Sequence, residues 1–422
     1  MFNKIIDLAK YIRRNKLENK EWIYVDNEFN VNLINILPNQ YYFKNDILIV
    51  DNPYGYLKEI NNREPAKHEL DQFIYIDKIS FINRKHAKGY IDINTFNHVI
   101  DSYRNLNSYL KSIIYADKKL CEEMTTNKIC LGKGITGMVC KLNNVNDVVV
   151  KEVDISKKDL TVFTNGVIIT NKKIHEVLIA AKFSQIYFGI NGSFNKNFLY
   201  YDGFFVCEHK LYLVMEKADG ILQDLFTKTI TLKIVKSLLF QLLFAVKTMQ
   251  YFYKAVHNDL HDRNVFINKV NIKEKYLRYK FKNDVWYIDN VGYIVKIGDL
   301  DVVSIFEKPS IIREDIYNDE LEGIYNVFLP GYDTLYIILI FIFFSQSYLY
   351  GNNEKYMIES FYAKLLKQIY DITNVKTNDF IKEFGSEELR PLIKYAKYDY
   401  SRLLLLFGEN RTDDYFEIAN II

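Results

Sequence analysis

The apolar positions of this chain repeat with two different periods. In residues 232–253 they recur every three or four residues, which predicts a long helix with one buried face. That face consists of Val235, Leu238, Leu239, Leu242 and Val246. Short runs rich in β-branched and aromatic residues predict strands upstream of it. The predicted strands are 131–142, 147–153, 201–207 and 211–216, with a helix predicted at 171–183.

The first 125 residues show similar patterns but no recognisable chemical motif. Strands are predicted at 41–43, 47–50 and 73–76, a helix near 97–116, and an amphipathic helix within 1–16. No Gly/Ser-rich or Pro-rich linker follows, so we expect this region to pack on the rest of the chain. It is either a structural accessory domain or a module that docks a partner.

Composition narrows the classes of protein. The net charge of +2 argues against a general nucleic-acid coat. The apolar run 335–344 is too short to cross a bilayer and predicts a buried helix. The four cysteines form no Cys-x-x-Cys pair, which favours reduced thiols in an intracellular compartment. We therefore expect a soluble intracellular protein.

Five short motifs that could carry catalytic or binding residues follow one another along the chain. They are G-K-G-I-T-G-M-V at 132–139, V-V-V-K at 148–151, L-V-M-E-K-A at 213–218, H-N-D-L-H-D-R-N at 257–264 and K-I-G-D-L-D at 296–301. The match at 257–264 is weak by itself, because many loops contain His, Asp and Asn, and the order of all five segments is what makes it informative. Together they resemble the protein kinase superfamily, in a divergent form.

The resemblance covers about residues 128–420 and implies an α+β, two-lobed kinase-like fold. The expected parts are the N-terminal α/β accessory region 1–125, a β-rich lobe 126–217 and a mainly helical lobe 218–422. ATP with Mg²⁺ or Mn²⁺ would bind between the lobes.

Glycines 132, 134 and 137 allow a backbone to approach phosphates without Cβ clashes. A simple turn or a dinucleotide-binding loop is the alternative, although a dinucleotide loop should open a helix and strand pattern continues here. The resemblance assigns Gly132, Gly134 and Gly137 to the phosphates of the nucleotide. It assigns the adenine site to Val139, Val149, Met215, Glu216 and Ala218.

The resemblance also assigns charged roles. Lys151 would neutralise the α- and β-phosphates and pair with Glu176 on the following helix. Either residue alone is also compatible with an ordinary strand end or a solvated helix position. Glu152 should point to the opposite face of the strand from Lys151. Asp259 would accept the proton of the attacking hydroxyl, while Asn264 and Asp299 would bind the metal.

Departures from the kinase pattern are informative. Asn258 replaces the arginine that ordinarily receives an activation-segment phosphate, so independence from that switch is expected. His261 stands where many serine/threonine kinases have lysine and is assigned to the γ-phosphate. Asp301 replaces a glycine and is expected to be solvated rather than to bind a second metal. Ala-Pro-Glu is missing; Glu320 or Glu322 would replace its glutamate as the partner of Arg411.

An insertion between Asn264 and Asp299 has the pattern of a hairpin with basic residues. They are Lys269, Lys273, Lys275, Arg278, Lys280 and Lys282. The alternatives are a solvated strand face and a docking surface for an acidic partner. The insertion and the Asp-Leu-His sequence resemble haspin-type kinases and kinases of large DNA viruses. A viral origin would place the protein in host cytoplasm or a virion.

The sequence thus predicts a serine/threonine protein kinase whose protein substrate is unknown. Two rivals stay open: a small-molecule phosphotransferase of the aminoglycoside or choline kinase type, and a non-catalytic scaffold that keeps the fold. No nucleic-acid partner is indicated.

Overall fold

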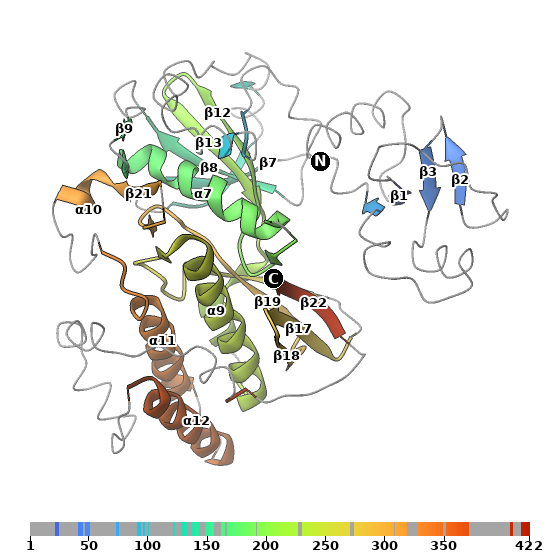
Figure 1. Cartoon of the computed structure of the whole chain (residues 1–422), viewed down its shortest axis with the longest axis vertical. Helices are drawn as coiled ribbons and strands as arrows, with labels where there is room; N and C mark the ends of the chain where they lie inside the picture. Colours follow the sequence, from blue (N-terminus) through green and yellow to red (C-terminus); the bar gives the residue numbers. More distant parts are fainter. Residues whose placement is uncertain are drawn as a thin grey trace. The chain divides into compact units, whose positions relative to one another are not determined.

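The computed structural model describes most of the chain from residue 128 onward (Figure 1). The described ranges are 128–133, 137–142, 148–155, 162–164, 167–190, 192–226, 230–270, 274–307, 309–318, 327–348, 352–370, 406–407 and 415–422. Before them it describes 22–24, 41–44, 47–50, 73–75, 91–93, 96–97, 100 and 121–122. The helix predicted within 1–16 lies outside these residues, as does most of the one predicted near 97–116.

The chain forms two compact units, Met1–Tyr90 and Ile91–Ile422. The first contains an antiparallel sheet with the strand order β2-β3-β1-β4. Its strands are β1 (Trp22–Tyr24), β2 (Tyr41–Lys44), β3 (Ile47–Val50) and β4 (Phe73–Tyr75). The strands expected at 41–43, 47–50 and 73–76 are therefore confirmed.

The second unit is built around a six-stranded antiparallel sheet with the order β5-β12-β13-β8-β7-β6. Its strands are β5 (Ile91–Asp92), β6 (Lys128–Lys133), β7 (Met138–Leu142), β8 (Val148–Asp154), β12 (Tyr201–Cys207) and β13 (Lys210–Glu216). Helix α7 (Lys172–Phe188) begins after Asn171, whose side chain accepts the backbone N–H of Lys173. This cap fixes where the helix starts.

The longest helix of the described residues, α9, has the predicted bounds Leu232–Tyr253. Thr231 caps its first turn by accepting the N–H of Ile234, and its apolar face is buried. Helices α11 (Tyr332–Tyr348) and α12 (Asn352–Tyr370) pack against it, and α8 (Leu222–Phe226) contacts α11. The short α10 (Glu314–Asn318) lies beside strand β21 (Ser310–Arg313) (Figure 1). The apolar run 335–344 lies within α11, where Leu335, Ile338 and Phe341 are buried.

Three smaller sheets connect these parts. One has the order β14-β16-β19, with β14 (Gly220–Ile221), β16 (Val265–Lys269) and β19 (Tyr293–Ile297). A second has the order β15-β20-β21-β10-β9, with β9 (Val162–Thr164), β10 (Val167–Thr170), β15 (Ala255–Val256), β20 (Ser304–Ile305) and β21 (Ser310–Arg313). A third has the order β11-β22-β17-β18, with β11 (Phe194–Asn195), β17 (Tyr276–Phe281), β18 (Asp284–Asp289) and β22 (Tyr415–Ile421).

The predicted basic hairpin is β17–β18, and two of its basic residues contact the rest of the fold. Arg278 forms an ion pair with Glu417 of β22, the strand that lies between β11 and β17. The ammonium of Lys282 lies over the ring of Tyr251 at 4.9 Å. Lys273 lies outside the described residues. Two of the six basic residues are therefore engaged within the fold, and docking of an acidic partner stays a hypothesis.

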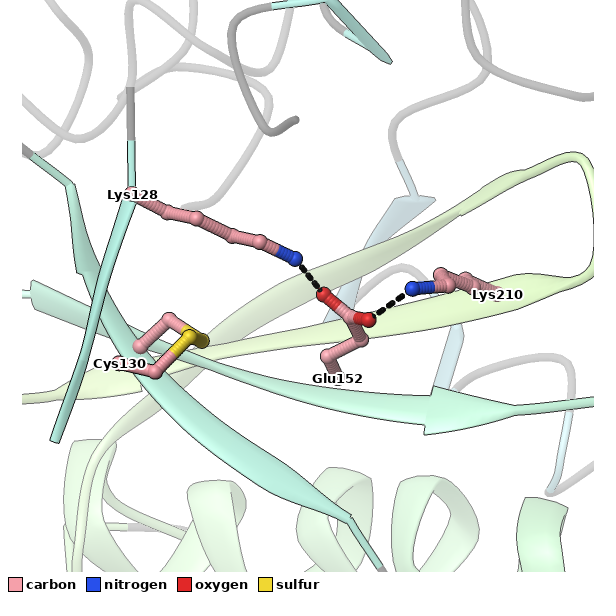
Figure 2. The surroundings of a disulfide bond; sticks show 5 residues. Lys128, Cys130, Glu152 and Lys210 are labelled. Carbon is pink, nitrogen blue, oxygen red and sulfur yellow. Dashed lines mark hydrogen bonds and ion pairs between the residues drawn. A yellow bond between two sulfur atoms is a disulfide. The ribbon is translucent and has the colours of Figure 1, made fainter. Parts of the chain in front are cut away.

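The expectation of reduced thiols is wrong, because all four cysteines are paired. Cys121 is bonded to Cys207, and Cys130 to Cys140. Cys130 and Cys140 are direct partners across β6 and β7 (Figure 2). Spacing along the sequence does not show which residues become opposite each other across two strands, so the pairing was hidden.

The chain is therefore a mixed α and β protein with several antiparallel sheets, as the sequence predicts at this level. Among the described residues, no helix is both long and apolar enough to span a membrane.

Candidate active site

Three of the predicted site residues meet at one buried point. Lys151 lies in β8, Glu176 in α7, and Asp299 follows β19. The Nζ atom of Lys151 lies 2.7 Å from Oε2 of Glu176 and 2.6 Å from Oδ1 of Asp299. The side chain of Asp299 is 34% exposed, whereas the other two are nearly inaccessible to water. Asp299 is therefore the member of the group that a ligand can reach.

The electrostatics of this group follow from burial and from the two carboxylates. Burial by itself would lower the pKa of Lys151, but Glu176 and Asp299 outweigh it and raise that pKa above its ordinary value. Burial raises the pKa of Glu176 to about 7, against the lowering effect of Lys151. The lysine is thus held as a cation.

Neighbouring residues on β8 point to opposite faces of the sheet. While Lys151 faces α7, Glu152 lies on the other face between Lys128 and Lys210 (Figure 2). The carboxylate of Glu152 accepts a hydrogen bond from each of these lysines. The prediction that Glu152 faces away from Lys151 is confirmed, and the alternation of side chains along a strand explains it.

The glycine-rich segment 132–139 runs from the end of β6 to the start of β7, and only part of it belongs to the described residues. Gly134 lies outside them. A Cβ built on Gly137 would lie 2.5 Å from the carbonyl oxygen of Glu152, so this glycine is required by the close approach of β7 to β8. A Cβ on Gly132 would meet nothing within 4 Å. Packing therefore explains one glycine of the pattern, and Gly132 keeps the predicted phosphate role as a hypothesis.

The residues assigned to the adenine site lie on adjoining strands. Val139 is paired in register with Lys151, and Val149 with Met215. Val149 and Met215 are buried and Val139 is partly exposed. At the end of β13 the carboxylate of Glu216 binds Lys296 at 2.5 Å and accepts the N–H of Tyr200 at 2.7 Å.

These bonds give the side chain of Glu216 a structural role that the sequence did not suggest. They fix the segment that leads to Ala218, which is partly exposed. The backbone there is thus held in place next to the residues assigned to adenine.

The loop between β15 and β16 carries Asp259, His261 and Asn264. Asn264 Nδ2 donates to the backbone oxygen of Asp259 at 2.9 Å and to its Oδ2 at 3.2 Å. Nε2 of His261 lies 3.6 Å from the same Oδ2. Burial raises the pKa of Asp259. Because the amide nitrogen of Asn264 is bonded to Asp259, its amide oxygen is the atom left for a metal.

Asp333, in the first turn of α11, holds the start of this loop in place. Asp333 is fully buried and accepts the backbone N–H groups of His257 at 2.8 Å and Asn258 at 3.1 Å. Burial raises the pKa of Asp333 to about 7, and the two N–H groups oppose that shift. These two bonds give Asp333 a structural role in holding the loop.

A histidine joins the same loop to Asp299. His257 Nε2 donates to the carbonyl oxygen of Gly298 at 3.0 Å. Asp299 itself has φ +54°, an unusual conformation for a residue other than glycine. Leu300 is buried and Asp301 is partly buried, with its pKa raised by burial and by Asp299. The expectation of a solvated Asp301 therefore holds only for part of its surface.

The sequence did not single out two buried residues at this site. His175, next to Glu176 in α7, and Arg313 in β21 both donate to the chain just after Asp299. Each is followed directly by an acidic residue (Glu176 and Glu314), so neither stands out in an apolar run and no local signal marks them. Glu320, Glu322 and Arg411, which were assigned to the end of the activation segment, lie outside the described residues.

Among the described residues no group of three or more His, Cys, Asp or Glu could hold a metal. A magnesium ion that is bound mainly through phosphates needs few protein ligands, and Asn264 with Asp299 fits that pattern. The donor set of one amide oxygen and one carboxylate is chemically suitable for Mg²⁺.

Comparison with known proteins supports the chemistry at a coarse level. No family model matches the chain. A stretch of 92 residues is 39% identical to a probable serine/threonine-protein kinase of Dictyostelium discoideum. The match covers 21% of this chain and only 7% of that protein. It supports a relationship to kinases and, in general terms, phosphotransferase chemistry.

Proposed function

We propose that the chain is an ATP-dependent protein kinase that phosphorylates serine or threonine. The observation that carries the proposal is the meeting of Lys151, Glu176 and Asp299, which come from a strand, a helix and a loop. A structural ion pair needs one carboxylate for one lysine. A second, partly exposed carboxylate on the same ammonium suits a site for a polyphosphate with its metal.

In this proposal the second unit has a two-lobed kinase arrangement with ATP between the sheet and α9. Lys151 binds the α- and β-phosphates, and Glu176 orients its ammonium. Asp259 binds the hydroxyl of the substrate and takes its proton, for which its raised pKa is favourable. Magnesium on Asn264 and Asp299 would neutralise phosphate charge. Catalysis rests on positioning and on charge, because phosphoryl transfer requires little covalent help from the protein.

The relative's printed description as a serine/threonine kinase favours a protein over a small-molecule acceptor. The contacts around Asp259 are compatible with either acceptor, so the acceptor is the part of the proposal that most needs a test.

The test uses the full chain with radiolabelled ATP and Mg²⁺. One set of reactions contains casein and a second contains a panel of aminoglycosides and aminoalcohols. We expect label on serine or threonine of protein. Asp259→Asn should reduce transfer by about 100-fold or more. The same carboxylate-to-amide change at Asp284, exposed at the tip of the hairpin, is the matched control.

Label on aminoalcohols alone would assign the chain to small-molecule phosphotransfer. Equal transfer by wild type and Asp259→Asn would show that the measured activity belongs to a contaminant. ATP binding without any transfer would support the scaffold.

A further inference from the structure

The backbone that follows Asp299 is held through three consecutive carbonyl oxygens. Each accepts a hydrogen bond from a different side chain: Arg313 Nη1 to Asp301 O at 3.1 Å, Asn258 Nδ2 to Val302 O at 2.9 Å, and His175 Nε2 to Val303 O at 2.6 Å. All three donors are buried, with 3%, 7% and 0% of their surface exposed. A buried donor that loses its acceptor costs free energy, so moving this stretch of backbone would leave three buried donors unpaired.

Two of the donors are fixed by a further side chain. The guanidinium of Arg313 binds both carboxylate oxygens of Asp315, at 2.5 and 2.8 Å. The carbonyl of Val303 can only accept, so Nε2 of His175 carries the proton, and Nδ1 accepts the hydroxyl of Thr170. Each donor is therefore held in the geometry that its carbonyl requires.

The third donor, Asn258, is fixed through the backbone. Its N–H is bonded to Asp333, and its φ is +68°, which asparagine tolerates better than most residues. Its carboxamide also lies 3.3 Å from the hydroxyl of Ser304.

The donors come from elements that carry other members of the site. His175 precedes Glu176 in α7, and Asn258 precedes Asp259 in the loop. Arg313 lies in β21, which pairs in parallel with β10, and Thr170 is its partner in register. The chain after Asp299 is thereby tied to the helix that carries Glu176 and to the loop that carries Asp259.

We propose that His175, Asn258 and Arg313 are positioning residues that keep Asp299 beside Lys151. Their bonds do this without requiring phosphorylation of residues 304–330. This inference rests on the proposed function. An arginine at position 258 would present a guanidinium that needs an anionic partner. Asn258 instead bonds the main chain directly. The backbone after Asp299 is therefore held by two neutral donors, Asn258 and His175, and by Arg313, whose charge is already paired with Asp315.

The test compares variants that remove one donor and keep the shape. Asn258→Asp preserves size and tolerance of positive φ, but places an oxygen against the carbonyl of Val302. His175→Leu removes a donor, whereas His175→Gln keeps an N–H that can reach Val303. Arg313→Lys keeps the charge and loses the paired bonds to Asp315. Glu307→Gln is the control, because Glu307 lies in the same segment in an exposed ion pair with Lys254.

We expect wild type treated with phosphatase to keep its full rate. Asn258→Asp and His175→Leu should lower kcat on the order of 100-fold, since a displacement of about 1 Å can cost that much. His175→Gln should recover most of the loss, and Glu307→Gln should match wild type. Thermal unfolding identifies any variant that does not fold, and Arg313→Lys then replaces it in the comparison.

Hydrogen exchange separates this inference from the proposed function. Amides of residues 300–303 should exchange faster in the donor variants, whether or not the protein transfers phosphate. Faster exchange with an inactive wild type would overturn the kinase proposal and leave the positioning contacts standing. Unchanged exchange and unchanged kcat in folded variants, or loss of activity after phosphatase treatment, would overturn the inference.

Discussion

The ammonium of Lys151 lies 2.7 Å from the carboxylate of Glu176, and their side chains are only 7% and 6% exposed. Asp299 lies 2.6 Å from the same ammonium, so one cation is shared by two carboxylates. Removing the cation therefore leaves two acidic groups close together with no counter-charge. A buried charge without a partner is among the most costly single defects in a protein.

Lys151→Met should lower the free energy of unfolding by about 3–5 kcal/mol near neutral pH. The loss should shrink in acid. Burial already raises the pKa of Glu176 from 4.5 to about 7, so folding favours its protonated form. An acid with a raised folded pKa costs stability as pH rises above 4.5, and protonation below 7 relieves that cost.

Urea unfolding measured between about pH 5 and pH 8 checks this prediction. The double variant Lys151→Met/Glu176→Gln should show a much flatter dependence on pH, because its glutamine does not titrate. Equal slopes for the single and the double variant would show that Glu176 is not the group responsible.

The third glycine of the glycine-rich segment gives a prediction about packing. A Cβ on Gly137 would lie 2.5 Å from the backbone oxygen of Glu152, which the sheet holds in place. Gly137→Ala should therefore push β7 away from β8 and cost about 1–3 kcal/mol. Gly132→Ala is the matched control, since its Cβ meets nothing within 4 Å. Chemical denaturation of both variants is sufficient, and equal losses would contradict the packing explanation.

Much of the fold could be predicted from local patterns. The bounds of α9 match the prediction because its apolar period is strong and Thr231 caps it. Both strands of the hairpin β12–β13 were also predicted, because each contains a run of apolar residues that includes β-branched and aromatic side chains. The strands β20 and β22 were not predicted. They form by pairing with strands distant in sequence: β20 pairs with β15, and β22 pairs with β11 and β17. The spacing of apolar residues within a short segment does not indicate such pairing.

Some residues of the candidate site could likewise be predicted from the sequence, and others could not. Lys151, Asp259 and Asp299 could be proposed because their spacing and order are distinctive. His175 escaped notice because α7 is buried along most of its length, so a buried histidine does not interrupt an amphipathic pattern. The partners of Glu216 and the cysteine pairs are likewise properties of the folded chain alone.

His175 also gives the protein a dependence on pH. Burial lowers its pKa from 6.5 to about 4, opposed by the carbonyl of Val303 and by Asp315 and reinforced by Arg313. The unfolded chain binds the proton more readily than the folded one. The stability that neutral His175 contributes to the folded state is fully present above pH 6.5 and is lost as pH falls toward 4. The loss in the free energy of unfolding amounts to about 3 kcal/mol.

Thermal or urea unfolding of wild type and His175→Gln between pH 4 and pH 7 measures this contribution. The glutamine variant keeps a donor to Val303 but has no proton to gain. Its stability should fall less steeply in acid. A wild-type curve parallel to that of the variant would place the acid sensitivity elsewhere, for example at the buried His257.

The two disulfides should differ in how much they stabilise the fold. A crosslink restricts the unfolded chain more when it closes a longer loop. Cys121 and Cys207 are 86 residues apart, whereas Cys130 and Cys140 are 10 apart. Replacing the first pair with serine should therefore cost about 2 kcal/mol more than replacing the second. Thiol titration of the denatured chain without reductant should first find no free thiol, and after that the unfolding curves of the two double variants give the comparison. A larger loss from the Cys130 and Cys140 variant would mean that the bond acts on the folded hairpin around the glycine-rich segment, rather than on the unfolded chain.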